Sequence, residues 1–413
     1  MHARTFQAGS AFLSRSGLRI FALLFLLFCL SGCAGRLTKA TELFYADQPD
    51  AALAKLDQWD WLSRRNRLLF LMERGVVLHQ LQRYRESAEQ LLAAAKMIKE
   101  FDRLSVSGQL GSLVTNEWLL SYKGEYSERL WVHSYLMMDF LLLGEYDSAY
   151  VEARQALELL GRHPDALKQA YFTRALIALC FANVAEDSDA YLVYRQLADD
   201  LPSPTPVAAD LVPLSSRLGQ TDEVERFEKF LPAQLPSGEG ELVLFVASGR
   251  IPHKRPGNFV LPPSIRFSFP YYEKGSTPPV RVGLAPYFPT LPILSSDLAA
   301  VAKQSLEARK LAIIAKETAR VAAKEVISQK VGNQHGDVAE AVVRISLFLL
   351  EEPDTRCWQT LPGRLTLVRV PLPAGRHKLR LNISGAGLFG PVEIDLPEIQ
   401  LNAGQRLFRS LRL

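Results

Sequence analysis

Cysteine and histidine are scarce in this chain, and neither occurs in the close spacing that a metal site requires. Of the 413 residues, four are Cys and seven are His, and the His residues stand singly. Two Cys residues lie near the N-terminus, which leaves Cys180 and Cys357, far apart in the sequence. A disulfide between these two is an open alternative in an oxidising compartment, whereas the apolar neighbours of Cys180 predict a small buried side chain. We expect no metal and no other cofactor.

Known catalytic motifs are also missing. The chain contains no Gly-x-Ser-x-Gly elbow, no His-Glu-x-x-His pair and no phosphate-binding loop. Carboxylate pairs such as Glu351 and Glu352 fall at the ends of expected helices, where solvated acids are ordinary. Isolated Ser and His residues cannot be assembled into a triad from sequence alone, so a hydrolase stays an alternative that requires a deep polar pocket. We expect that the protein is not an enzyme.

The chain lacks both a strong net charge and a long apolar run. It has 48 basic and 44 acidic residues; three basic ones, Arg4, Arg15 and Arg19, precede the apolar run at residues 20–30, and no acid occurs before Glu42. Without those three the balance is 45 to 44, which does not favour a nucleic-acid partner. The apolar run at residues 20–30 has eleven residues, and a bilayer-spanning helix needs about 20. The length leaves room for two or three domains.

That short apolar run is instead typical of a secretory signal peptide over residues 1–32, because it follows basic residues and ends in small ones. The sequence Leu30-Ser31-Gly32-Cys33 resembles the lipobox of bacterial lipoproteins. The resemblance implies cleavage before Cys33, fatty acylation of its thiol, as with palmitate, and of its new amino group, and hence a lipid anchor. The next residue is Ala34 rather than Asp, which in Gram-negative members favours the outer membrane, on its periplasmic face. The alternative is an ordinary cleaved signal with an incidental Cys.

Residues 33–231 have the periodicity of helices, beginning at Leu37, and resemble tetratricopeptide repeats. In such repeats a small residue lies three places after the turn that opens each second helix. We place the turns at Pro49, Tyr84, Tyr146, Asp187 and Thr221. Their spacings are 35, 62, 41 and 34 residues, so the second contains an insertion or a decayed unit near residues 97–122. Met137 and Pro213 depart from the pattern, and an irregular helical bundle is the alternative.

A stack of helix pairs forms a concave surface that usually binds a peptide or a partner protein. Aromatic residues gather near the insertion, and we take Trp118, Tyr122 and Tyr126 as candidate binding residues. At helical spacing, aromatic side chains are more often part of the core.

The second half, residues 241–413, follows a linker at residues 232–240 and predicts an α+β domain. The overall fold class is therefore a multidomain α+β protein, with an N-terminal α-solenoid and a C-terminal antiparallel sheet. We predict strands at residues 241–247, which are buried on both faces, and at 264–269, 280–284, 364–372, 378–383 and 407–413. Residues 373–376 would join two of them as a hairpin. Helices are predicted at residues 295–331 and 337–352, the first capped by Ser295, Ser296 or Asp297 and ended by Gly332. This long basic helix either lies on a membrane or packs on a sheet.

Peptides at residues 249–254, 354–362 and 369–377 resemble signatures of a family of bacterial lipoproteins with a helical repeat region and a C-terminal mixed domain. The resemblance implies architecture and location but no reaction. Lys254, Arg356 and Trp358 are further candidate binding residues, although Arg356 stacked on Trp358 could form a structural corner. We therefore hypothesise a lipid-anchored envelope adaptor that binds a partner protein through its repeats. The second hypothesis is a lipoprotein that binds a glycan or anionic lipid through its C-terminal domain.

Overall fold

The computed structural model describes residues 32–58, 65–105, 121–231, 238–261, 265–288, 290–349, 353–385 and 390–413. Most of the predicted signal peptide, and Trp118, lie outside the described residues. Of the predicted lipobox, only the backbone of Gly32 and Cys33 is described, where a helix begins. The chain divides into two compact units, residues 1–63 and 64–413.

The described residues of the first unit form two helices that pack on each other, α2 (Gly32–Tyr45) and α3 (Pro49–Asp57). Apolar side chains one helical turn apart are buried, at Ala40 and Phe44 in α2 and at Leu53 and Leu56 in α3. This is the amphipathic pattern of a helix pair.

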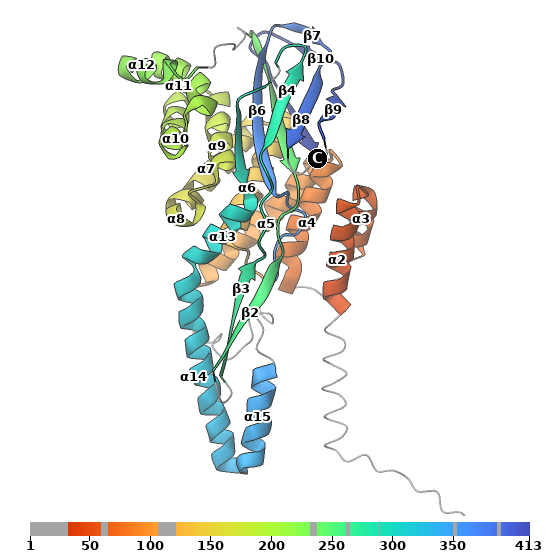
Figure 1. The fold of residues 1–413 in the computed structure, drawn as a ribbon, viewed down its shortest axis with the longest axis vertical. Helices are drawn as coiled ribbons and strands as arrows, with labels where there is room; N and C mark the ends of the chain where they lie inside the picture. Colours follow the sequence, from red (N-terminus) through yellow and green to blue (C-terminus); the bar gives the residue numbers. More distant parts are fainter. Residues whose placement is uncertain are drawn as a thin grey trace, which may run out of the picture. The chain divides into compact units, whose positions relative to one another are not determined.

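The second unit begins with a row of helix pairs, each packed on the next (Figure 1). The pairs are α4 (Arg67–Gln80) with α5 (Tyr84–Ser105), α6 (Tyr126–Leu143) with α7 (Tyr146–Arg162), α9 (Tyr171–Asn183) with α10 (Asp187–Asp200), and α11 (Thr205–Arg217) with α12 (Thr221–Glu228). The short helix α8 (Pro164–Leu167) precedes α9. All five predicted turn residues are the first residues of second helices, so the repeat pattern is confirmed.

Small residues allow the helices of a pair to approach closely. A Cβ atom added to Gly75 in α4 would lie 2.6 Å from Cδ2 of Leu91 in α5, closer than carbon atoms pack. Ala149, Ala153 and Ala156 of α7 are likewise fully buried. Larger residues are tolerated elsewhere, because Met137 is buried within α6 and Pro213 lies inside α11 without ending it.

The rest of the second unit contains four small sheets. Their strands are β1 (Gly240–Ser248), β2 (Lys254–Leu261), β3 (Ile265–Tyr272), β4 (Val280–Ala285), β5 (Ile293–Asp297), β6 (Arg364–Leu372), β7 (Gly375–His377), β8 (Arg380–Gly385), β9 (Val392–Asp395), β10 (Ile399–Leu401) and β11 (Arg406–Arg412). The largest sheet has the order β11-β1-β6-β5, and a second has the order β4-β8-β9. Strands β2 and β3 form one hairpin, and β7 pairs with β10.

Strand β1 is the centre of a three-layer arrangement and is buried on both faces, as predicted. On one face, Leu242, Leu244 and Val246 pack in a core with Val282 and Leu381 of the β4-β8-β9 sheet. On the other face, the ring of Phe245 lies 6.4 Å from that of Phe172 in α9. Sheet β11-β1-β6-β5 therefore lies between a second sheet and the helix pairs (Figure 1).

The face of the row formed by the first helices α4, α6 and α9, here called the inner face, is covered by this sheet. Helices α4 and α6 contact β11, and α9 contacts β5 and β6. Polar bonds cross the contact: the amide of Phe172 donates to Oγ of Ser296 at 2.9 Å, and Nε2 of His79 lies 2.7 Å from Oγ of Ser410. The inner face thus packs against the chain's own strands.

One sequence prediction about the strands is wrong. The predicted hairpin of residues 364–372 with 378–383 does not form, because β6 pairs with β1 and β5 while β8 pairs with β4 and β9. These pairings are antiparallel, as predicted for this half of the chain, and β11 joins the largest sheet parallel to β1. Pairing is decided by contacts between distant segments, which local patterns do not contain.

The predicted long helix at residues 295–331 is divided. Ser295 and Ser296 belong to β5, and Asp297 caps α13 (Leu298–Ala308) by accepting a bond from the amide of Ala300 at 3.2 Å. A second helix, α14 (Lys310–His335), follows and ends at Gly336, four residues beyond the predicted stop. Helix α15 (Asp337–Leu349) then packs back on α14.

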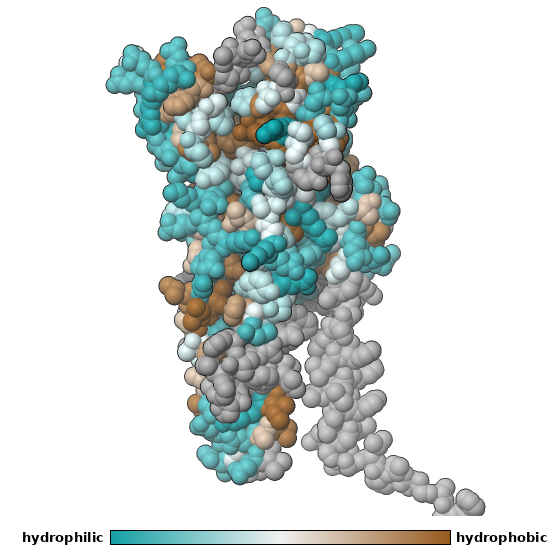
Figure 2. Space-filling view, in the orientation of Figure 1, coloured by the Kyte–Doolittle hydropathy of each residue, from teal (hydrophilic) through white to brown (hydrophobic). Residues whose placement is uncertain are grey.

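Helices α14 and α15 form a hairpin that contacts β3. Apolar side chains are exposed along it, at Leu311, Ile314, Val326, Val342 and Ile345. Figure 2 shows hydrophobic patches over this part of the surface. Among the described helices, none combines the length and the apolar character that crossing a bilayer requires.

The predicted linker at residues 232–240 falls inside the second compact unit. Its residues 232–237 lie outside the described residues, and 240 already begins β1. The boundary between a repeat domain and a C-terminal domain stays a prediction.

Candidate functional site

Two clusters of charged residues lie between the helix pairs and the strands. The first, here called the junction, contains the buried carboxylates of Glu73, Glu125 and Glu128, together with Lys254 and the segment 353–361. Glu73 lies on α4, Glu125 caps α6, and Glu128 lies in the first turn of α6. Because both helices belong to the inner face, the junction occupies the part of the array where a solenoid would hold a peptide.

At the junction, two carboxylates hold three consecutive backbone amides of the chain itself. Glu128 accepts a bond from the amide of Trp358 at 2.7 Å. Glu73 accepts bonds from the amides of Gln359 at 2.7 Å and Thr360 at 3.0 Å. Charge-assisted bonds of this kind are stronger than neutral ones. The segment is therefore held on the inner face by its main chain.

The other carboxylate of the junction, Glu125, is neutralised by cations. It accepts a bond from Nζ of Lys254 at 2.6 Å and another from Arg309. Burial alone would raise the pKa of Glu125, but the charges of Lys254 and Arg309 outweigh it and lower that pKa to about 2. Glu73 has amide donors instead of a cation, and burial raises its pKa to about 7.

The structure brings most of the predicted binding residues to this junction, with their polar groups directed inward. Arg356 bonds to Asp354 at 2.7 and 2.8 Å and to Oδ1 of Asn66 at 2.8 Å. Its guanidinium lies 5.3 Å from the ring centre of Tyr122, so the predicted stacking on Trp358 is wrong. The hydroxyl of Tyr122 donates to the buried carboxylate of Glu128 described above.

Trp358 and Tyr126 are also engaged within the protein. Trp358 is fully buried, and its Nε1 donates to Oγ1 of Thr360 at 3.2 Å. The ring of Tyr126 stacks on that of His163, with the ring centres 3.7 Å apart, and the guanidinium of Arg309 lies 5.5 Å from the centre of the Tyr126 ring. These arrangements favour a structural role for the predicted residues over contact with a glycan or lipid. The remaining candidate, Trp118, lies outside the described residues.

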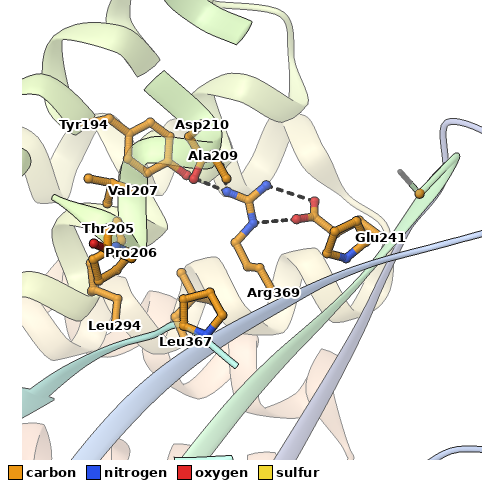
Figure 3. A pocket seen from close by; sticks show the side chains of 14 residues that line it. Tyr194, Thr205, Pro206, Val207, Ala209, Asp210, Glu241, Leu294, Leu367 and Arg369 are labelled. Atoms are coloured by element: carbon orange, nitrogen blue, oxygen red, sulfur yellow. Dashed lines mark hydrogen bonds and ion pairs between the residues drawn. The ribbon is translucent and has the colours of Figure 1, made fainter. Parts of the chain in front are cut away.

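The second cluster lines an open cavity of about 350 Å³, here called the α11 cavity (Figure 3). Its walls come from α9, α10 and α11 on one side and from β1, β5 and β6 on the other. Apolar side chains form much of the wall, among them Val207, Leu294 and Leu367. The volume is at the lower end of the range for small-ligand sites.

Arg369 of β6 is the central charged residue of the α11 cavity. Figure 3 shows its guanidinium between Glu241 on one side and Tyr194 and Asp210 on the other. It bonds to Glu241 at 2.6 and 3.0 Å, to the Tyr194 hydroxyl at 3.2 Å, and to Oδ1 of Asp210. Glu241 also accepts a bond from Arg406 at 2.8 Å. Acids and bases thus alternate from Asp210 to Arg406.

The carboxylates of the cavity differ in electrostatic environment. Burial raises the pKa of Asp210, and the nearby Arg369 only partly offsets this. Glu241 has two guanidinium partners, which outweigh burial and lower its pKa. None of the described residues donates to the second oxygen of Asp210.

A second cavity of about 690 Å³ adjoins the first and shares Gly238, Glu241 and Pro371 with it. It is lined further by Asn183, whose Oδ1 accepts a bond from Arg406 at 2.7 Å. Glu241 and its two guanidinium partners therefore lie along both cavities.

Sequence reasoning did not select Arg369 or Asp210 as site residues. Arg369 was noticed only as part of a signature peptide. The available signal was a charge on the inward face of a strand, since Arg369 lies on the same face of β6 as Leu365 and Leu367. A charged residue at such a position needs a buried partner, which a sequence cannot name.

Two further expectations concern cysteine and metals. Cys180 is fully buried, as predicted, and both Cys180 and Cys357 are free, so the disulfide left open does not form. Burial raises the pKa of Cys357 to about 12, which makes its thiol a poor nucleophile. Within the described residues, no three His, Cys, Asp or Glu side chains are grouped to hold a metal ion.

No protein-family model matches the chain, and no curated protein matches it. Solved structures do resemble about half of it. MamA (residues 41 to the end) from Desulfovibrio magneticus RS-1 is 14% identical, with 47% of this chain and 90% of MamA covered and a TM-score of 0.33. YrrB, "a TPR protein with an unusual peptide-binding site", is 13% identical, with 47% and 82% covered and a TM-score of 0.33. Likeness at this level supports no conclusion about function.

Proposed function

We propose that this protein is a cell-envelope adaptor, anchored by lipid and binding a partner protein at the α11 cavity, rather than an enzyme. The proposal rests on the observation that the inner face of the helix pairs is covered by other parts of the chain. In a helix-pair array the inner face is the usual binding surface. Here the strands and the segment 353–361 cover much of it. The α11 cavity lies where α10 and α11 meet the edge of the sheet and is open.

The lipid anchor is supported by the sequence Leu30-Ser31-Gly32-Cys33 and by Ala34 after it. Two or more acyl chains hold a protein on a membrane far more firmly than one. Replacing Cys33 by Ala should move the protein from the outer-membrane fraction to the soluble periplasmic fraction. Continued sedimentation of the Cys33→Ala protein with the membranes, after a salt wash, would remove the anchor from the proposal.

Partner binding is tested by photocrosslinking in intact cells. A photoreactive amino acid replaces Ala209, an exposed residue of α11 that lines the cavity. The matched control replaces Ser216, which is exposed on the same helix and does not line the cavity. We expect one discrete protein adduct from position 209 and none from position 216. Absence of an adduct at 209, or equal adducts at both positions, would contradict the adaptor function.

A further inference from the structure

We propose that the α11 cavity binds a cationic group, and specifically an Arg or Lys side chain of the partner protein. This inference rests on the proposed adaptor function and gives the chemistry of its binding site. It is argued from the charges that line the cavity, from the hydrogen-bonding capacity left on them, and from the shape of the walls.

The two acids that line the cavity have unequal cationic partners. Glu241 accepts bonds from both Arg369 and Arg406, although Arg406 lines the adjoining cavity. Asp210 has Arg369 alone and shares it with Glu241. Asp210 is therefore the acid that is better placed to bind a ligand with a positive charge.

The hydrogen-bonding capacity that remains on Arg369 and Asp210 also favours a cationic ligand. Arg369 already donates through Nε and through both terminal nitrogens, to Glu241, Tyr194 and Asp210. Only one N–H, on Nη2, is left without an acceptor among the described residues, so a ligand carboxylate could not bind Arg369 through two bonds as Glu241 does. Asp210, in contrast, is only 12% exposed and uses one oxygen for Arg369, while no described residue donates to the other. This second oxygen is therefore open to the cavity and can accept a bond from a charged donor of a ligand.

The walls fit a long side chain with a charged end. Val207, Leu294 and Leu367 are apolar and line the same cavity as the charged residues (Figure 3). The methylene groups of Arg or Lys can pack along such a surface while the charged end reaches an acid. A cavity of about 350 Å³ accommodates one such side chain with part of its backbone.

The test uses three peptides that differ at one residue and the purified full chain. Each peptide is a blocked pentapeptide with glycines around a central Arg, Gln or Glu, and binding is measured by ligand-observed NMR at neutral pH. We expect the Arg peptide to bind about tenfold more tightly than the Gln peptide, and the Glu peptide to bind most weakly. Equal affinities, a preference for Glu, or no binding at millimolar concentration would overturn the proposal.

Variants assign the binding to the cavity. Asp210→Asn should remove the preference for Arg over Gln. Ala209→Trp keeps every charged residue of the cavity, reduces its volume and should abolish binding, whereas Ser216→Trp should leave binding unchanged. If Ala209→Trp binds the Arg peptide as well as the unmodified protein does, the site is elsewhere. A partner adduct from position 209 combined with a failed peptide test would overturn this inference alone. Absence of any adduct would overturn the adaptor function itself.

Discussion

The junction and the α11 cavity both contain ion pairs of Arg or Lys with carboxylates, but their carboxylates are satisfied to different degrees. Both place Arg or Lys against carboxylates where first helices and α11 meet the strands. At the junction, the chain's own amides and cations occupy Glu73, Glu125 and Glu128. In the cavity, Asp210 keeps one oxygen without a donor among the described residues. The comparison indicates that one cluster holds the molecule together and the other is available for binding.

The largest effect is expected from removing a cation of the junction. Lys254→Met leaves Glu125 buried with less compensation and should lower the free energy of unfolding by about 3–5 kcal/mol. Lys310→Met is the control, because Lys310 pairs with Glu307 on the surface and should contribute less than about 1 kcal/mol. Denaturant unfolding measures both. If the two variants lose the same stability, the junction does not hold the molecule together.

A second effect should appear in acid. The pKa of Glu125 is lowered from 4.5 to about 2, so its ionised form stabilises the folded state above pH 4.5. This stabilisation, about 3 kcal/mol, should be lost as the pH falls from about 4.5 to about 2. Unfolding measured across this range should show a steeper loss for the unmodified protein than for Glu125→Gln. Parallel pH profiles would contradict the assignment.

The opposite pH dependence is expected for Glu73. Its pKa is raised from 4.5 to about 7, so the folded protein binds a proton more tightly than the unfolded chain does. Stability should therefore rise by about 2–3 kcal/mol as the pH falls from about 8 to about 5. Glu73→Gln removes this titration, and its unfolding free energy should be flatter over the same window. An unchanged slope in the variant would show that another group titrates there.

The smallest effect is expected at the α11 cavity. Ala209 is exposed and lines an open space, so Ala209→Trp should change the free energy of unfolding by no more than about 0.5 kcal/mol. Thermal unfolding beside the unmodified protein and Ser216→Trp checks this. A loss comparable with that of Lys254→Met would mean that the cavity is structural as well, and the contrast between the two clusters would disappear.

Much of the helical part could be predicted from the sequence, because its signals are local. Tyr84, Tyr146 and Asp187 were identified as turn positions from residues within one repeat, and each begins a second helix. Helix pairs are built from neighbours in the chain, so their pattern lies within one stretch of sequence. The buried strand β1 was predictable for the same reason, as a continuous apolar run.

The strands and both charged clusters could be predicted only in part. Strand β2 was missed because it contains Pro256 and Gly257, which usually argue against a strand. Lys254 and Arg356 were recognised as unusual, but their burial depends on Glu125 and Asn66, which are far away in the sequence. The sequence alone does not indicate whether a charged residue will contact solvent, a ligand or another residue of the chain.

Hydrogen exchange of the backbone amides at the junction tests the central claim most directly. The amides of Trp358, Gln359 and Thr360 bond to buried carboxylates and should exchange only when the whole second unit unfolds. The same is expected of the amide of Leu244 in the central strand β1. The expected result is the same high protection at all four amides. Rapid exchange of the three segment amides, with Leu244 still protected, would show that the segment leaves the inner face. In that case this part of the inner face could bind a partner, and the α11 cavity would no longer be favoured as the binding site.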